Sequence, residues 1–247
     1  MTDQSIGLPN FSLTVPAPCP YLPGRRERKV FTQLVGEDAQ ALNDALTQVG
    51  FRRSQNVVYK PACDGCEACV SVRIPVDRFR PSRWMRRIMR ANADLKVRAS
   101  GLASTDEQFH LLRRYLKARH PDGGMAEMDL YDFMEMVEAS PVDTFVVEYR
   151  MSSTGQQPHY GDLVGSCLTD MMSDGLSMVY SFYDPDQDKR SLGSYIILSH
   201  VELAQRLRLP YVYLGYWIAG CRKMDYKARF RPLEILGDDG WEPFSGR

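Results

Sequence analysis

Apolar residues recur along the chain with two different spacings, which predict a mixture of helices and strands. In residues 38–49 they fall three and four positions apart, the spacing of one helical face, and Gly50 follows directly. Residues 70–76 alternate apolar and polar side chains as a half-buried strand does, and residues 95–100 do so more weakly. These patterns predict one helix and two strands in the first 100 residues.

The second half of the chain is richer in regular segments. The apolar spacing predicts helices over 105–120, 129–139 and 191–209, and each is followed by a proline, which ends a helix. Extended segments are predicted over 143–150, 162–172, 175–185 and 211–218, with a turn-rich stretch over 152–161. The change to helical segments near residue 100 predicts a domain boundary there, with domains 1–100 and 101–247.

A further short helix is predicted over residues 81–92, PSRWMRRIMRAN, with Ser82 as the N-cap. Four arginines fall at helical spacing on one side, and they define the arginine stripe: Arg83, Arg86, Arg87 and Arg90. The apolar residues of the opposite side can anchor the helix to a core: Trp84, Met85, Ile88 and Met89. Neighbouring like charges repel, so phosphates of a nucleic acid would relieve the stripe. A solvated helix face is the alternative.

The charge of the 247 residues is zero overall but strongly segregated. Residues 73–119 hold thirteen Arg or Lys against four acids, and residues 121–188 hold fourteen acids against one Arg. Residues 206–231 reverse the balance, with seven basic residues against one acid. Such a chain can present a basic face to a polyanion.

Composition is that of an ordinary globular protein, with 44% hydrophobic and 25% charged residues. No apolar run approaches the roughly 18 residues of a membrane span, so no membrane partner is expected. Residues 1–18 lack the pattern of an export signal. A cytoplasmic, reducing location is therefore expected, where disulfides are rare.

Four of the six cysteines are candidates for a metal site. Cys63, Cys66 and Cys69 stand three residues apart in PACDGCEACV, and Cys19 lies in PCPYLPGR. Four thiolates suffice to hold zinc or an iron–sulfur cluster. A reduced structural cluster is the alternative. The four histidines show no metal spacing, and His200, on an apolar helix, is expected to be a hydrogen-bonded interior residue.

The order of elements after residue 104 resembles the acyltransferase fold of the GCN5-related N-acetyltransferase superfamily. The resemblance implies a mixed α/β (α+β) chain, with an acyltransferase-like C-terminal domain and a smaller cysteine-containing N-terminal α+β domain. In the superfamily a basic residue and a glycine before the central helix hold a pyrophosphate, and KRSLGSY supplies Lys189, Arg190 and Gly193 there. Tyr195 stands where the superfamily usually has a small residue, which argues against coenzyme A.

Several long motifs together resemble the bacterial aspartate/glutamate leucyltransferases, relatives of the eukaryotic arginyl-tRNA–protein transferases. They are CPYLPGR at 19–25, YKPACDGCEACVSVRI at 59–74, FYDPDQDKRSLGSYIILSHVELA at 182–204 and YVYLGYWIAGCRKMDYKARFRPLE at 211–234. The resemblance implies transfer of leucine from leucyl-tRNA to the N-terminal Asp or Glu of a protein, which marks it for N-end rule degradation. No cofactor is implied for the transfer itself, although cysteines of eukaryotic relatives are implicated in binding iron–sulfur clusters or zinc.

The implied reaction suggests which side chains matter. An aminoacyl ester is already activated, so the enzyme must hold an amine against a carbonyl and exclude water. The acidic acceptor side chain should meet basic groups, and the candidates are Arg25, Arg28, Arg73, Lys223, Lys227 and Arg229. Candidates to orient the amine or the ester are Tyr216, Asp225 and Tyr226. The leucyl side chain could meet Leu214, Trp217, Phe182 and Tyr180, which could equally be ordinary core. Phosphates near the tRNA 3′ end could meet Arg190, Ser191, Gly193 and Ser194.

Three alternatives remain open at this point. Arginine could replace leucine as the transferred residue. An acetyl-coenzyme A-dependent N-acetyltransferase is a second enzyme hypothesis, and Tyr195 argues against it. A non-catalytic regulator that binds tRNA or a peptide is the third, and the transferase motifs argue against it.

Overall fold

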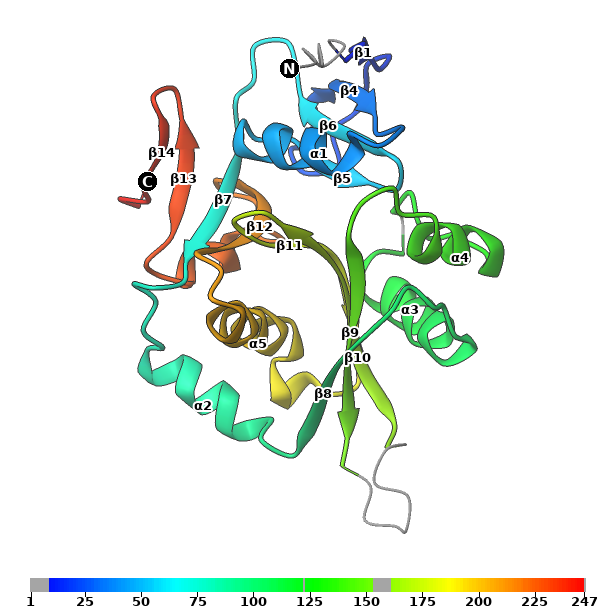
Figure 1. The fold of residues 1–247 in the computed structure, drawn as a ribbon, viewed down its shortest axis with the longest axis vertical. Coiled ribbons are helices and arrows are strands. Elements are labelled where there is room, and N and C mark those ends of the chain that lie inside the picture. Colours follow the sequence, from blue (N-terminus) through cyan, green and yellow to red (C-terminus); the bar gives the residue numbers. More distant parts are fainter. Residues whose placement is uncertain (1–8, 122, 153–160, 247) are drawn as a thin grey trace, which may run out of the picture.

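An eight-stranded sheet forms the centre of the fold (Figure 1). The structure is a computed structural model that describes residues 9–121, 123–152 and 161–246. The strand order is β14-β13-β7-β12-β11-β10-β9-β8, and every neighbouring pair is antiparallel except β11 and β12. The strands are β7 (Cys69–Pro75), β8 (Leu95–Ser100), β9 (Thr144–Met151), β10 (Leu163–Met172), β11 (Gly175–Tyr183), β12 (Tyr211–Ile218), β13 (Glu234–Gly237) and β14 (Gly240–Pro243).

Helices cover both faces of this sheet (Figure 1). On one face, α5 (Leu192–Leu207) and α2 (Arg83–Ala91) share a core with β7 and β12. On the other, α3 (Asp106–Arg119) and α4 (Leu130–Glu138) pack on β9, β10 and β11. Short 3₁₀ helices precede α5 and follow β12, namely η1 (Asp188–Arg190) and η2 (Asp225–Arg229). The sheet therefore separates two hydrophobic cores.

A small sheet and one helix form the N-terminal part, which lies on one end of the large sheet (Figure 1). The sheet has the order β1-β4-β6-β5, and β2 pairs with β3. The elements are β1 (Ser12–Leu13), β2 (Ala17–Pro18), β3 (Arg26–Glu27), β4 (Lys29–Gln33), α1 (Ala39–Gln48), β5 (Arg52–Ser54) and β6 (Val57–Pro61). A third, small core fills the space beneath α1.

A buried ion pair fixes the small sheet to the large one. The Arg53 guanidinium donates from Nε and Nη2 to the two oxygens of Asp170 at 2.7 and 2.6 Å, and both side chains are 1% exposed. The hydroxyl of Thr144 donates to the same carboxylate at 2.7 Å, and Arg53 Nη1 donates to the Gln55 carbonyl. Because both charged groups make several hydrogen bonds, the pair tolerates its burial.

The helices and strands predicted from residue 38 onward are confirmed, including Ser82 and Thr105 as N-caps. The predicted turn-rich stretch 152–161 lies mostly outside the described residues. The predicted interior position of His200 is also confirmed, because its ring contacts Thr169, Tyr149 and Ile196. The domain boundary near residue 100 stays a prediction, and β7 and β8, which precede it, belong to the large sheet. In the described part of the chain no helix is long and apolar enough to cross a membrane.

Breaking the buried pair should strongly destabilise the protein. Asp170→Ala leaves the Arg53 charge buried and unpaired, so we expect a loss of about 3–5 kcal/mol in the free energy of unfolding. Chemical denaturation followed by circular dichroism measures it. The control is Asp188→Ala, which breaks an exposed pair with Arg119 and should cost less than about 1 kcal/mol. Equal losses in the two variants would contradict a structural role for the buried pair.

Candidate active site

The two parallel strands of the large sheet separate along their length. β11 and β12 pair only through Gly175–Ser177 and Tyr211–Tyr213. Farther along, a bulge in β11 leaves Val179 without a partner on β10. β12 shifts its pairing with β7 at the same level, where Gly215 has a φ of +74°. The carboxyl halves of both strands therefore diverge and leave a gap between them.

The Arg52 side chain fills this gap. Its Nη2 donates to the carbonyls of Met178 and Val179 at 3.1 and 3.3 Å, at the β11 bulge. On the other side its guanidinium lies 5.8 Å from the centre of the Tyr216 ring and against Gly215, where a Cβ would collide with it. Sequence reasoning missed Arg52. The available signal was a glycine inside an aromatic strand, which marks the close approach of another group.

A pocket lies on the face of β12 that carries Tyr216, and we call it the cysteine pocket. All four candidate cysteines line it, with Tyr21, Tyr59 and a basic segment over residues 25–29. Lys29 pairs with Glu27 at 3.0 Å, and Arg26 and Arg28 donate to the carbonyls of Pro16 and Thr14. Among the described residues, the Arg25 side chain has no hydrogen bond or ion pair. Its guanidinium can therefore take an anion.

The cysteine pocket has the right donor atoms for a metal but not the arrangement. Four thiols would suit zinc or an iron–sulfur cluster, yet no three Cys, His, Asp or Glu side chains in the described ranges are placed to hold a metal ion. Burial, and then the nearby Cys19, Cys63 and Cys66, raise the pKa of Cys69 to about 12. The Cys69 thiol therefore stays protonated as placed, and the arrangement of the described side chains does not fit the predicted metal.

Tyr216 and Lys227 are engaged in bonds to the backbone. The Tyr216 hydroxyl lies 3.0 Å from the carbonyls of both Gly50 and Tyr59 and donates to them. Lys227, on η2, is buried and donates from Nζ to the Tyr216 carbonyl at 2.6 Å. Burial, and then the Arg52 charge, lower the pKa of Lys227 well below its ordinary value. Both side chains hold the end of β12 in place.

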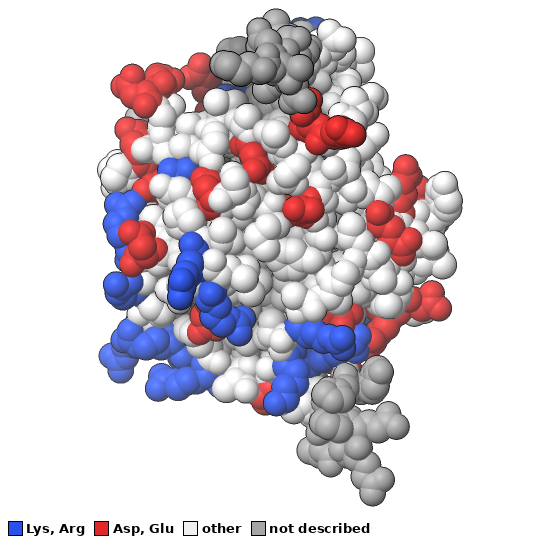
Figure 2. All heavy atoms as spheres, in the orientation of Figure 1, with Lys and Arg blue, Asp and Glu red and all other residues white. Residues whose placement is uncertain are grey.

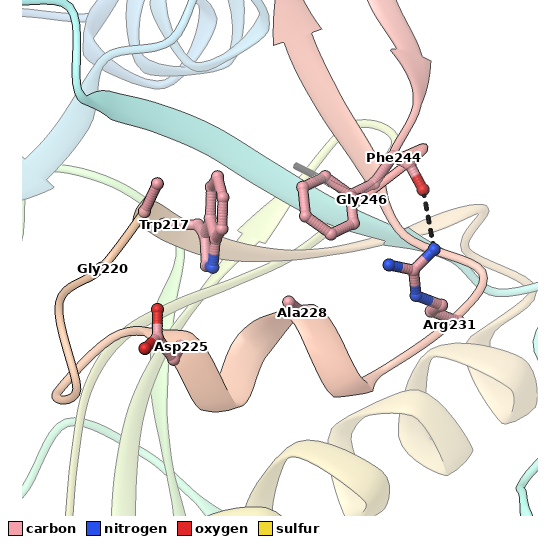
Figure 3. A pocket seen from close by; sticks show the side chains of 8 residues that line it. Trp217, Gly220, Asp225, Ala228, Arg231, Phe244 and Gly246 are labelled. Carbon is pink, nitrogen blue, oxygen red and sulfur yellow. Dashed lines mark hydrogen bonds between the residues drawn. The ribbon is translucent and has the colours of Figure 1, made fainter.

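A second pocket opens on the opposite face of β12, and we call it the tryptophan pocket (Figure 3). Trp217, Asp225, Ala228, Arg231 and Phe244 line it, together with glycines 220 and 246 and Ala219. The rings of Trp217 and Phe244 meet edge to face, 4.9 Å apart. The two pockets lie at the same end of β12 because Tyr216 and Trp217 are consecutive and point to opposite faces.

The remaining candidates are distributed more widely. Arg73 is buried, where it pairs with Glu234 at 2.9 Å and stacks on Tyr211 and Trp241. The predicted leucyl-contacting residues lie in two separate cores, Leu214 and Trp217 in one and Phe182 and Tyr180 in the other. Four exposed candidates lie on or beside η2, namely Lys223, Asp225, Tyr226 and Arg229. Burial of the hydroxyl raises the pKa of Tyr226 to about 12, and Arg229 lies 4.3 Å from the Trp84 ring centre.

The start of α5, the predicted phosphate site, is partly occupied by the protein itself. The Arg190 guanidinium makes two bonds to the Asp94 carboxylate, at 2.8 and 2.9 Å. Ser191 has a left-handed backbone, and a Cβ at Gly193 would lie 2.9 Å from the Tyr183 ring. The local charge of Arg190 is therefore already neutralised.

The predicted fold class is confirmed by comparison with solved structures. The crystal structure titled FemX aligns with a TM-score of 0.51 at 8% identity and covers 84% of this chain and 69% of that one. At that identity the match describes the fold alone. The divergence of β11 and β12 beside the central helix α5 gives the chain the architecture of a GCN5-related acyltransferase.

Sequence comparisons define the family. The descriptions "Arginine-tRNA-protein transferase, N terminus" and "Arginine-tRNA-protein transferase, C terminus" match residues 17–87 and 107–237. A protein of Parvibaculum lavamentivorans named aspartate/glutamate leucyltransferase is 56% identical and covers 98% of both chains. One of Sphingopyxis alaskensis with that name is 57% identical and covers 96% of this chain and 91% of its own length. The chain therefore belongs to the aspartate/glutamate leucyltransferases of the arginine-tRNA–protein transferase family. The predicted family, enzyme class and aminoacyl-tRNA–protein transferase function are confirmed.

The contact between Arg52 and Gly215 should appear in a comparison of two glycines. Gly215→Ala introduces both an unfavourable positive φ and a collision with Arg52, whereas Gly220→Ala introduces only the φ, since nothing lies within 4 Å of its added Cβ. We expect Gly220→Ala to cost about 1–2 kcal/mol in unfolding free energy and Gly215→Ala clearly more.

Repeating both substitutions in an Arg52→Ala background separates the two effects. Removing Arg52 should abolish most of the difference between the two glycine variants, because only the collision depends on it. A difference that persists in full would show that the gap is not filled by Arg52. Urea denaturation measures all six proteins.

Proposed function

We propose that this chain moves leucine from leucyl-tRNA to an N-terminal Asp or Glu at the gap between β11 and β12, with the acceptor bound in the cysteine pocket. Family membership supports the reaction. The observation that carries the placement is the unpaired Arg25 guanidinium in a pocket with four cationic side chains and one carboxylate. Tyr216 lines this pocket and lies beside Arg52, the residue in the gap. A guanidinium can bind the acceptor's acidic side chain through two hydrogen bonds.

The charge of the cysteine pocket also suits the chemistry of the acceptor amine. An α-amino group titrates near pH ~8, and nearby positive charges lower its pKa because they disfavour the ammonium form. Arg25, Arg28 and, beyond Tyr216, Arg52 supply such charges. The same residues therefore recognise the acidic side chain and increase the fraction of neutral, nucleophilic amine.

The reaction needs positioning more than a strong base. The neutral amine attacks the ester carbonyl, the new C–N bond forms, and the tRNA leaves as its 3′-terminal alcohol after taking a proton that the amine gives up. Lys227, whose pKa burial lowers, donates to the Tyr216 carbonyl, and the Tyr216 hydroxyl donates to the Gly50 carbonyl. These two bonds hold the backbone of β12 beside the gap. No step passes through a metal or another cofactor.

The tRNA would lie along the arginine stripe. All four of its arginines are exposed, and Trp84, Met85, Ile88 and Met89 pack against the core as predicted. Figure 2 shows Lys and Arg gathered over the lower part of this face, around α2 and β8, with Asp and Glu prominent elsewhere. Near α2 lies the start of α5, with Ser191, Gly193 and Ser194, and the exposed Lys189 lies just before it on η1. The proposal also includes a division into domains 1–100 and 101–247 and a cytoplasmic location. After transfer, the modified protein would pass to degradation machinery.

Replacement of Arg25 tests the acceptor pocket. Arg25→Ala should lower kcat/KM for peptides that begin with Asp or Glu about 10- to 100-fold, since a hydrogen-bonded charge contributes about 1.5–3 kcal/mol. Transfer of radiolabelled leucine from charged tRNA to such peptides measures it, with arginyl-tRNA and Ala-peptides as negative substrates. The control is Arg26→Ala, whose guanidinium is committed to Pro16. Equal activity of the Arg25 and Arg26 variants would place the acceptor elsewhere.

Charge reversal tests the arginine stripe. Arg86→Glu with Arg87→Glu should weaken tRNA binding and reduce the slope of log K against log salt by about 2, because at least two phosphate contacts are lost. Filter binding at several salt concentrations measures both quantities. The matched control reverses two exposed cations on α3, across the sheet, by Arg113→Glu with Lys117→Glu. An unchanged affinity and slope in the stripe variant would identify a solvated helix face.

A further inference from the structure

The tryptophan pocket contains a buried donor that the fold leaves unused. Trp217 is 7% exposed, and its indole Nε1–H has no acceptor among the described residues. Buried polar groups almost always have a partner, so such a donor needs a specific explanation. The indole nitrogen points into the pocket, towards the space between Asp225 and Ala228 (Figure 3). With a volume of about 340 Å³, the pocket can take a small organic group.

Charged, polar and apolar groups follow one another along the tryptophan pocket. Figure 3 shows Asp225 at one end of the pocket and Arg231 at the other, with Trp217, Phe244 and Ala228 between them. The Asp225 side chain has neither a hydrogen bond nor an ion pair in the part of the chain that the structure describes. Arg231 donates to the Phe244 carbonyl at 3.0 Å and is otherwise exposed. The pocket thus offers an anion, a neutral donor, an apolar wall and a cation in sequence.

We propose that the tryptophan pocket binds the leucyl end of the donor tRNA. The α-ammonium of the leucyl group pairs with Asp225, its ester carbonyl accepts a hydrogen bond from Trp217 Nε1, and its branched side chain packs on Ala228 and Phe244. Arg231 lies where the ribose and the last phosphate leave the pocket. This inference rests on the proposed function, to which it adds the site of the transferred group.

The chemistry favours the donor amine over the acceptor amine at Asp225. A carboxylate stabilises the ammonium form of an amine next to it, and an ammonium cannot attack a carbonyl. The acceptor amine must lose its proton, so Asp225 would slow the reaction if the acceptor were bound there. The donor amine does not react, and keeping it charged prevents it from competing as a nucleophile. A nucleobase fits less well, because the Trp217 and Phe244 rings, each 7% exposed, present little surface for stacking.

Direct binding of a stable donor analogue tests the inference. The probes are 3′-leucylamino-3′-deoxyadenosine, which carries a free α-amine, and its N-acetyl derivative, which has no charge at that position. Isothermal titration calorimetry measures both with the full-length wild-type protein, Asp225→Asn and Trp217→Phe. The matched control is Asp239→Asn, at an exposed carboxylate of the β13–β14 turn. Asp225→Asn keeps the shape of the side chain and loses no bond to a described residue.

Each variant has its own expected signature. The wild type and Asp239→Asn should bind the free-amine probe at least tenfold more tightly than the acetylated one. Asp225→Asn should reduce this preference to nearly one, whereas Trp217→Phe should weaken both probes by a similar factor, since both retain the carbonyl. A preference that survives in Asp225→Asn would overturn the inference. The inference would also be overturned if Asp225→Asn raised the KM for an Asp-peptide and left binding of both probes unchanged. That result would place the acceptor in this pocket.

The outcome separates this inference from the proposed function. If the wild type transfers leucine but probe binding ignores Asp225, the function stands and the pocket assignment fails. If probe binding depends on Asp225 but no leucine reaches Asp- or Glu-peptides, the pocket assignment stands and the proposed reaction fails. Should Trp217→Phe not fold, Asp225→Asn alone decides the question.

Discussion

Two consecutive arginines at the start of β5 hold the molecule together. Arg53 makes the buried pair with Asp170 on β10, and Arg52 enters the gap between β11 and β12. Successive side chains of a strand point in opposite directions, so one short strand reaches two different parts of the large sheet. The buried Arg53 guanidinium depends on the carboxylate that it meets, and the half-buried Arg52 guanidinium on the carbonyl oxygens. The cysteine pocket is therefore held against the diverging strands by charge as well as by packing.

The end of β12 divides the chemistry between two sides of one strand. Tyr216 faces the cationic cysteine pocket and Trp217 faces the pocket with Asp225, on the opposite side. The acceptor amine, which must be neutral to react, would thus lie among cations. The donor amine, which is better kept charged, would lie beside a carboxylate. The two electrostatic environments can lie this close together because β12 and the rest of the sheet separate the two pockets. The two substrates would have to meet at the carboxyl end of β12, beside the gap that Arg52 fills.

The sequence predicted the long elements well and the short ones poorly. Periodicity over ten or more residues, together with caps such as Thr105, located α1, α3 and α5. The strands β4, β5 and β6 have three to five residues, too few for a clear pattern. The pairing of the candidate Arg73 with Glu234 could not be predicted, because the two residues lie 161 positions apart in the chain. Motif spacing gathered the four cysteines correctly but carried no information about the distances between their sulfur atoms.

The position of β7 has a consequence for synthesis of the chain. β7 lies between β12 and β13, both of which come from the last 40 residues of the sequence. At a translation rate of roughly 5–20 residues per second, β7 emerges from the ribosome about 7–27 s before β12 does. During that interval the strand, which alternates apolar and polar side chains, has no partner on either edge. The part of the large sheet around β7 is therefore completed only after β12 and β13 have been made, and until then the backbone groups of β7 are open to pairing with another strand.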